Sequence, residues 1–144
     1  MADDRIDILR KVTLFESLSD KELEAVARAT KERRYDTGDV IVSEGDTGVG
    51  FFVVAEGTAR VEASGKRVGQ LTPGDSFGEV ALLDEAGRRS ATVIAESQTK
   101  LYGLTAWQFT PLLDQHPGLA VKIARSLAKT LRETQERANR PADG

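Results

Sequence analysis

Between about Arg34 and Leu104, short apolar runs repeatedly alternate with glycine-containing turns, and this pattern constrains the fold more than any other feature of the chain. The runs include VIVS, FFVVAE, ARVEA, RVGQL, ATVIAE and KLYGL, and they are separated by Gly-Asp, Glu-Gly and Ser-Gly turns. Many short strands with regular turn signals are typical of a sandwich, a jelly roll or a barrel. We therefore predict a mainly β fold for this stretch.

Helical patterns flank the predicted strands on both sides. Ser19 and Glu22 have the spacing of a capping box, and an apolar stripe of helical period follows them. After the strands, Thr105 is the expected N-cap of a helix, and Pro117 separates this helix from a longer one. Trp107 falls in the first of these helices, where we expect it in the core. The predicted single domain over 1–144 has helices over 3–32, β-structure over 33–104 with a short helix over 78–84, and helices over 106–116 and 118–139.

Composition excludes several classes of protein. The chain has no cysteine, which rules out disulfides, thiolate metal sites and thiol nucleophiles and fits a reducing compartment. Because the N-terminus is not of signal-peptide type and no apolar run reaches the roughly 18 residues of a membrane span, we expect a cytoplasmic protein without membrane contact. A net charge of −3 argues against nucleic acid as a partner.

The segment FGEVALLDEAGRRSA, residues 77 to 91, carries the chemistry. Gly78 begins the predicted short helix, whose N-terminus would offer free N–H groups to an anion that approaches the backbone closely. Arg89 supplies a fork of donors for phosphate oxygens, and Ser90 supplies a hydroxyl. Consecutive residues entering a strand point to opposite faces, so only one of Arg88 and Arg89 should point inward, and we favour Arg89.

Glu79 identifies the rest of the ligand. A carboxylate beside a phosphate is repulsive unless the ligand also carries a hydroxyl donor, as a ribose does with its 2′-OH. One arginine suffices for a ligand with about one negative charge, such as a cyclic phosphodiester. The segment therefore predicts a clamp for the phosphate and the ribose of a cyclic nucleotide.

These residues resemble the phosphate-binding cassette of the cyclic nucleotide-binding domain family, which includes the bacterial cyclic-AMP receptors and the regulatory subunits of protein kinase A. The cassette reads F-G-E-x-A-L followed by R-[ST/A]-A, and it matches Phe77 to Leu82 and Arg89 to Ala91. The flanking Gly74-Asp75 and Glu44-Gly45-Asp46 turns and the FFVVAEGTARV segment match as well, so the likeness extends over about residues 8 to 138. The resemblance implies a β-roll (a jelly-roll-like barrel) with N-terminal helices and a long C-terminal helix.

The resemblance also implies a role for individual residues. Glu79 would bind the ribose 2′-OH, and Arg89 and Ser90 would hold the cyclic phosphate. Val61 and Leu71 fall where the bacterial receptors pack the purine, and a gapless match along the last helix places Thr134 at the base amino group. The implied ligand-binding set is Gly78, Glu79, Val80, Arg89, Ser90, Ala91, Val61, Leu71 and Thr134.

The implied function is a regulatory sensor of cyclic AMP, or alternatively of cyclic GMP, since Ser90 is compatible with both. No cofactor, metal or nucleic-acid partner is expected. The receptor's helix-turn-helix domain has no counterpart in this chain, which leaves the downstream protein partner open. The last helix carries a narrow apolar seam that could pair with a second copy in a homodimer.

Two other classes of protein, an interaction module and an enzyme, compete with the sensor. The domain could be a dimerisation or interaction module of the same fold that binds no ligand. For the single residue Thr134, the alternative to a base contact is an ordinary solvated side chain. An enzyme of cupin type is disfavoured, because its metal would need two or three histidines and the chain has one, outside the predicted strands. We expect no catalytic residues.

Overall fold

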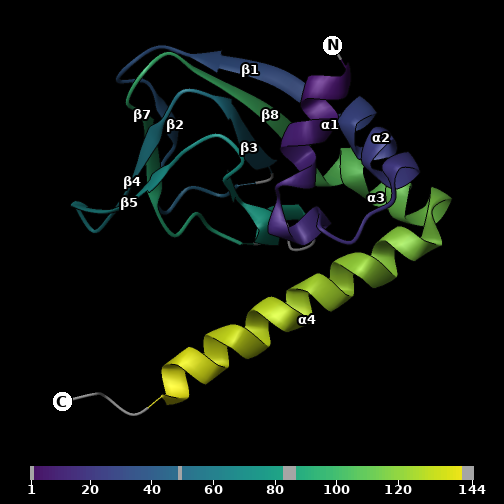
Figure 1. Cartoon of the computed structure of the whole chain (residues 1–144). Coiled ribbons are helices and arrows are strands. Elements are labelled where there is room, and N and C mark those ends of the chain that lie inside the picture. The colour runs from purple at the N-terminus through teal and green to yellow at the C-terminus, as the bar shows by residue number, and fades with distance from the viewer. Residues whose placement is uncertain (1, 49, 83–86, 141–144) are drawn as a thin grey trace.

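The computed structural model describes residues 2–48, 50–82 and 87–140, which form two antiparallel sheets with helices at both ends of the chain (Figure 1). The strands are β1 (Lys31–Tyr35), β2 (Val40–Val42), β3 (Gly50–Glu56), β4 (Ala59–Ala63), β5 (Lys66–Leu71), β6 (Ser76–Phe77), β7 (Thr92–Ala95) and β8 (Thr99–Thr105). The helices are α1 (Ala2–Arg10), α2 (Asp20–Ala29), α3 (Ala106–Gln115) and α4 (Pro117–Asn139), with 3-10 turns η1 (Thr13–Phe15) and η2 (Glu79–Leu82).

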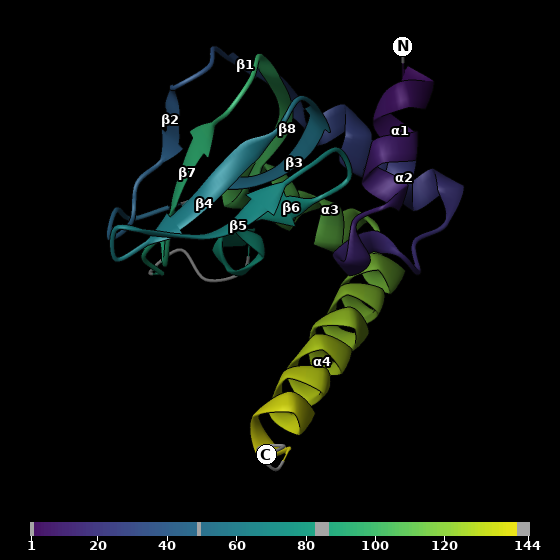
Figure 2. The same ribbon diagram turned by 60° about the vertical axis from the view of Figure 1, so that its left-hand side comes forward.

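The strands form two four-stranded sheets, with orders β1-β8-β3-β6 and β2-β7-β4-β5. Both sheets are antiparallel, and Figure 2 shows β4, β5 and β7 lying across from β3 and β8. The mainly β roll with flanking helices and a long C-terminal helix is thus confirmed. Strand β1 starts at Lys31, before the predicted boundary, because its largely polar residues are recruited by pairing with β8 rather than by an apolar pattern.

One face of the first sheet packs against the helices. Phe51 and Val53 of β3 are fully buried with residues of α1, α2 and α3, and the rings of Phe15 and Phe51 meet edge to face at 5.5 Å. Both predicted N-caps are found. In α2, Glu22 Oε1 accepts from the Ser19 N–H at 2.8 Å, and Ser19 Oγ accepts from the Glu22 N–H at 3.2 Å. This closed capping box sets the start of α2.

Helix α4 buries side chains against the domain along its first turns, up to Leu127. Leu119 and Ile123 are buried against the helical core, and Lys122 Nζ binds Glu22 Oε1 at 2.7 Å. The Lys122 ammonium, together with the Ser19 N–H, holds the pKa of the Glu22 carboxyl below its usual value. Beyond Leu127 every residue to the end of the helix is exposed, and Figures 1 and 2 both show this part running away from the roll. This part therefore projects from the domain as an arm, which contacts the domain again where Lys129 Nζ lies 3.4 Å from Glu16 Oε1. None of the described helices has the length and apolar character of a membrane span.

Candidate functional site

A cavity of about 410 Å³ lies between the second sheet and the predicted cassette. Val42, Val61 and Val93, from three adjacent strands of that sheet, supply apolar wall. Polar groups come from the other side, from Ser76, Glu79, Arg88, Arg89 and Ser90. An apolar wall faced by a few converging polar groups, in a volume within the roughly 300–1,000 Å³ of small-molecule sites, is the general form of a ligand pocket.

Arg89 is the central charged group of this cavity. Its side chain is partly buried, and its Nη2 donates to the Gly50 carbonyl oxygen at 2.7 Å. Burial lowers the pKa of Arg89 from its usual value, but the guanidinium remains charged at neutral pH. The Arg89 N–H and carbonyl pair with Asp46 and Gly45, both at 2.8 Å, which anchors the backbone at this point. The cationic group is thus fixed before any ligand arrives.

Glycines make the space that Arg89 occupies. A Cβ on Gly48 would lie 1.9 Å from Arg89 Nε. Any side chain at position 48 would therefore force Arg89 out of its present position. A Cβ on Gly78 would lie 2.6 Å from Arg89 Nη1 and 2.5 Å from the Gly50 oxygen, and Gly78 also has a φ of +87°. Positive φ is strained for residues that carry a Cβ. Gly78 therefore allows the cassette backbone to turn directly over the guanidinium.

Glu79 lies at the start of η2 and faces the same cavity. Its Oε1 accepts a hydrogen bond from the Ser76 hydroxyl at 2.7 Å, which orients the carboxylate. The same carboxylate can accept from a ribose hydroxyl. The predicted start of the cassette helix at Gly78 is wrong, because Gly78 has a positive φ and the 3-10 turn runs from Glu79 to Leu82. The predicted residues 83–84 lie outside the described residues. So short a turn carries little dipole, and Arg89 is the main source of positive charge.

The two neighbouring arginines differ as predicted. Arg88 is exposed, and its Nη1 donates to the Gly45 carbonyl oxygen at 2.9 Å, on the loop that precedes β3. Arg89 is partly buried and contacts β3 itself. Arg88 therefore lies at the rim of the cavity and serves as a natural control for Arg89.

The structure brings most of the predicted binding residues to this cavity, namely Gly78, Glu79, Arg89, Ser90, Ala91 and Val61. Leu71 is partly buried on β5, but it is not among the residues that line the cavity. The side chain of Val80 lies outside the described part of the structure. Thr134 is exposed on the projecting arm of α4, where its hydroxyl donates to the Thr130 carbonyl at 2.9 Å. In this conformation Thr134 is not at the cavity, and its contact with a base stays a prediction.

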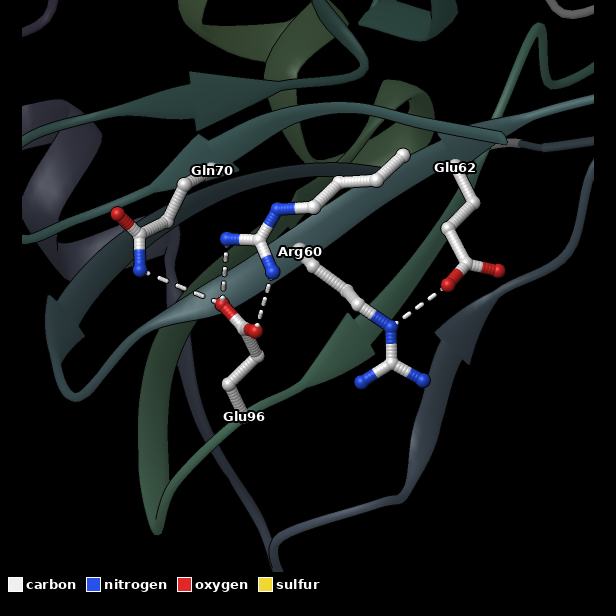
Figure 3. A network of polar contacts seen from close by, with 5 residues as sticks. Arg60, Glu62, Gln70 and Glu96 are labelled. Atoms are coloured by element: carbon white, nitrogen blue, oxygen red, sulfur yellow. Dashed lines mark hydrogen bonds and ion pairs between the residues drawn. The ribbon is translucent and has the colours of Figure 1, made fainter. Parts of the chain in front are cut away.

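A network of polar contacts lies on the second sheet and includes Arg60, Glu62, Gln70 and Glu96 (Figure 3). Because side chains alternate along β4, Arg60 and Glu62 point away from the cavity, and they pair at 2.7 Å. Glu96, just after β7, accepts from Arg67 Nη1 at 2.8 Å and from Gln70 Nε2 at 3.3 Å, both on β5. The Arg67 contact lowers the pKa of the Glu96 carboxyl. The network ties β5 to the segment after β7 on the outer side of the sheet.

Sequence reasoning missed Gly48, the Gly50 carbonyl and Ser76. These groups position Arg89 and Glu79 rather than forming the recognisable motif. Gly48 and Gly50 are separated from Arg89 by about forty positions in the sequence, so no local pattern could reveal the contact. The recurring glycines predict turns, and nothing in that pattern distinguishes Gly48 and Gly50 from the other glycines.

Comparison with known proteins now fixes the family. Residues 32–116 match the model of the "Cyclic nucleotide-binding domain". The chain is 34% identical over 125 residues to the "Cyclic AMP receptor protein" of Thermus thermophilus, an alignment that covers 83% of this chain and 57% of that one. It is 36% identical over 110 residues to a "cGMP-dependent protein kinase" of Toxoplasma gondii, covering 76% of this chain and 11% of the kinase.

A solved structure agrees. The N-terminal domain of a transcriptional regulator from Streptomyces coelicolor superposes with a TM-score of 0.86 at 31% identity, covering 96% of this chain and 99% of that domain. The chain therefore belongs to the cyclic nucleotide-binding domain family. It spans little more than half the length of the receptor and about a tenth of the kinase.

Proposed function

We propose that the protein is a regulatory sensor of cyclic AMP. The observation that carries this proposal is the partly buried Arg89 at the cavity that Glu79 also lines. The guanidinium would hold the cyclic phosphate, and the carboxylate would accept from the ribose 2′-hydroxyl. Ser90 adds a hydroxyl at the exposed rim. No catalytic group is needed for this role, and we propose that the protein is not an enzyme.

Cyclic GMP is the alternative ligand. A cyclic nucleotide of either kind presents the same phosphate and ribose, so Arg89 and Glu79 do not discriminate between them. One relative is named as a cyclic-AMP receptor and another as a cyclic-GMP-dependent kinase, which makes both ligands reasonable for this chain. We favour cyclic AMP because Thr134 has the position in the last helix from which a bacterial receptor would reach the base.

The projecting arm of α4 is the proposed moving part. Its first turns are fixed by Leu119, Ile123 and the Lys122–Glu22 ion pair, whereas everything beyond Leu127 is exposed. A base in the cavity would offer the arm a surface on which to dock, and this would bring Thr134 inward. A ligand shifts such an equilibrium only by its differential affinity for the two positions of the arm.

The same arm could join two copies of the protein. Leu131 is 58% exposed and continues the apolar seam of Ile123 and Leu127 along the helix. Ile123 is buried against the helical core, so the part of the seam open to a second copy is the partly buried Leu127 and the exposed Leu131. We therefore propose a homodimer through α4. A monomer mass at micromolar concentration, with and without ligand, would contradict it.

Calorimetric titration of cyclic AMP and cyclic GMP tests the sensor. The wild-type protein, freed of co-purified nucleotide, should bind one of them, and Arg89→Ala should weaken binding at least about tenfold, because a charged hydrogen bond contributes roughly 1.5–3 kcal/mol. Arg88→Ala is the matched control, because Arg88 is the neighbouring arginine, carries the same charge and is exposed. Equal losses in both variants would contradict the assigned role of Arg89. Absence of heat with either nucleotide on folded protein would favour an interaction module without ligand.

A further inference from the structure

A second cavity, of about 130 Å³, lies where β1, β8 and β3 meet the start of α3. Its lining shares no residue with the larger cavity. Lys31 and Arg33 contribute two cations, Phe52 and Trp107 two aromatic rings, and Gln108 an amide. We call this site the Trp107 groove. It is a distinct recess, and it neighbours the larger cavity, because Arg89 donates to the Gly50 carbonyl and lies 6.0 Å from the centre of the Phe52 ring.

Trp107 is unusually placed for a large aromatic residue. Its side chain is 61% exposed, although the sequence pattern predicted it in the core, and it is the only tryptophan of the chain. Helix α3 buries Phe109 and Leu112 instead. The start of the helix is fixed, since Gln108 Oε1 accepts from both the N–H and the hydroxyl of Thr105, at 3.0 and 2.8 Å. Trp107 is therefore presented outward on a rigid first turn.

The two cations of the groove lie on one face of an edge strand. Lys31 and Arg33 are two positions apart on β1, so their side chains point the same way. In the described part of the chain neither has an ion-pair partner, whereas their neighbour Arg34 binds Glu32 at 2.9 Å. The groove thus combines two exposed cations with the exposed Trp107 ring.

The absence of a side chain at Gly103 makes room for an aromatic ring in the groove. Lys31, Gly103 and Phe52 form one row of paired positions across β1, β8 and β3. A Cβ on Gly103 would lie 3.0 Å from the Phe52 ring, so the ring lies directly over the glycine backbone. The partly buried Phe52 ring therefore lines the groove together with the two cations and Trp107.

We propose that the Trp107 groove docks an acidic segment of a partner protein. Carboxylates of that segment would pair with Lys31 and Arg33, and an apolar side chain would pack against Trp107 and Phe52. Charge complementarity decides the chemistry of the partner. Tryptophan and arginine are the residues most enriched at the energetic centres of protein interfaces.

The volume of the groove is below the roughly 300 Å³ of typical small-molecule pockets, but it accommodates a side chain. The outer edge of β1 also leaves backbone groups free for an extended peptide.

Selection from a displayed library of random short peptides tests the chemistry of the occupant. The whole chain is immobilised through its C-terminus. We expect the enriched peptides to combine several acidic residues with an apolar or aromatic one, and we expect the enrichment to disappear on a Lys31→Glu/Arg33→Glu protein. Enriched peptides that are basic or neutral, or that bind the double variant equally well, would overturn the proposal, as would the absence of any enrichment.

An individual selected peptide then tests the location. Because Trp107 is the only tryptophan, its fluorescence should change on binding, and calorimetry with Trp107→Ala should show at least about tenfold weaker affinity. The matched control is Arg34→Glu, which reverses a charge on the same strand outside the groove and should change affinity by no more than about twofold. Thermal unfolding of each variant confirms that it is folded. Equal losses from Arg34→Glu and from the groove variant would refute the site.

A second copy of this chain is the competing occupant. Sedimentation analysis of the wild type and of Lys31→Glu/Arg33→Glu decides between the two. If the double variant abolishes self-association, the groove binds another copy and the proposal of a separate partner is wrong. If the oligomeric state is unchanged while peptide binding is lost, the partner proposal stands.

Discussion

Replacing Gly48 with alanine would test whether the seat of Arg89 sets the ligand affinity. The added Cβ would lie 1.9 Å from Nε, 2.4 Å from Cζ and 2.7 Å from Cδ of Arg89. All three atoms belong to one side chain and Gly48 has no positive φ, so the backbone can accept alanine and the arginine must move. Arg89 would then lose its 2.7 Å hydrogen bond to Gly50 and its aim at the phosphate. A charged hydrogen bond of about 1.5–3 kcal/mol corresponds to roughly 10- to 100-fold weaker binding.

A double-mutant cycle by calorimetry separates this effect from a general loss of structure. Gly48→Ala should weaken cyclic-nucleotide binding in the wild type but have no further effect in an Arg89→Ala background, since both changes remove the same interaction. Gly69→Ala is the control, because a Cβ there meets no atom within 4 Å. Wild-type affinity in Gly48→Ala, or losses that add up in the double variant, would refute the reasoning.

Three further outcomes follow from the described contacts. The pKa of the Glu22 carboxyl is lower in the folded protein than in the unfolded chain, where it is about 4.3. The ionised carboxylate therefore stabilises the fold above about pH 4.3, and this stabilisation is lost as the pH falls through the lower pKa of the folded state. Urea unfolding should therefore show Glu22→Gln less stable than wild type by about 1 kcal/mol at pH 7, and this difference should shrink below about pH 4; a constant difference would contradict the role of the Lys122 pair. Ser19→Ala removes the acceptor for the Glu22 N–H and should cost about 1 kcal/mol of unfolding free energy, whereas an unchanged midpoint would show that the cap is dispensable. Leu131→Glu should change monomer stability by less than about 0.5 kcal/mol, because the side chain is 58% exposed, but sedimentation should show loss of the proposed dimer.

Local features of the sequence predicted local structure well. Ser19 and Thr105 mark helix starts because the groups that cap a helix lie within a few residues of each other. The cassette motif likewise identified Arg89 and Glu79, which both lie at the main cavity. Alternating apolar runs separated by glycines gave the class of the fold, although they did not mark β1, whose four exposed residues carry no such pattern.

Features that depend on distant segments could not be predicted. The close fit of Gly48 to Arg89 joins two loops and has no signature in either of them. Trp107 was expected in the core because it is large and apolar, but the buried face of α3 is formed by Ala106, Phe109 and Leu112, and Trp107 lies off this face with 61% exposure. A gapless match placed Thr134 near the base, but matching a helix by sequence does not determine whether the helix is docked.

The contact between Gly48 and Arg89 also has a consequence for reading related sequences. A chain that keeps an arginine here cannot freely accept a larger residue at the facing position, because the two would occupy the same volume. Once the arginine is lost, the constraint on its partner disappears with it, while Gly78 would still be required by its positive φ. Among homologues, the identity of the residue facing the arginine should thus report whether the anion site is in use, even where the cassette itself has become hard to recognise.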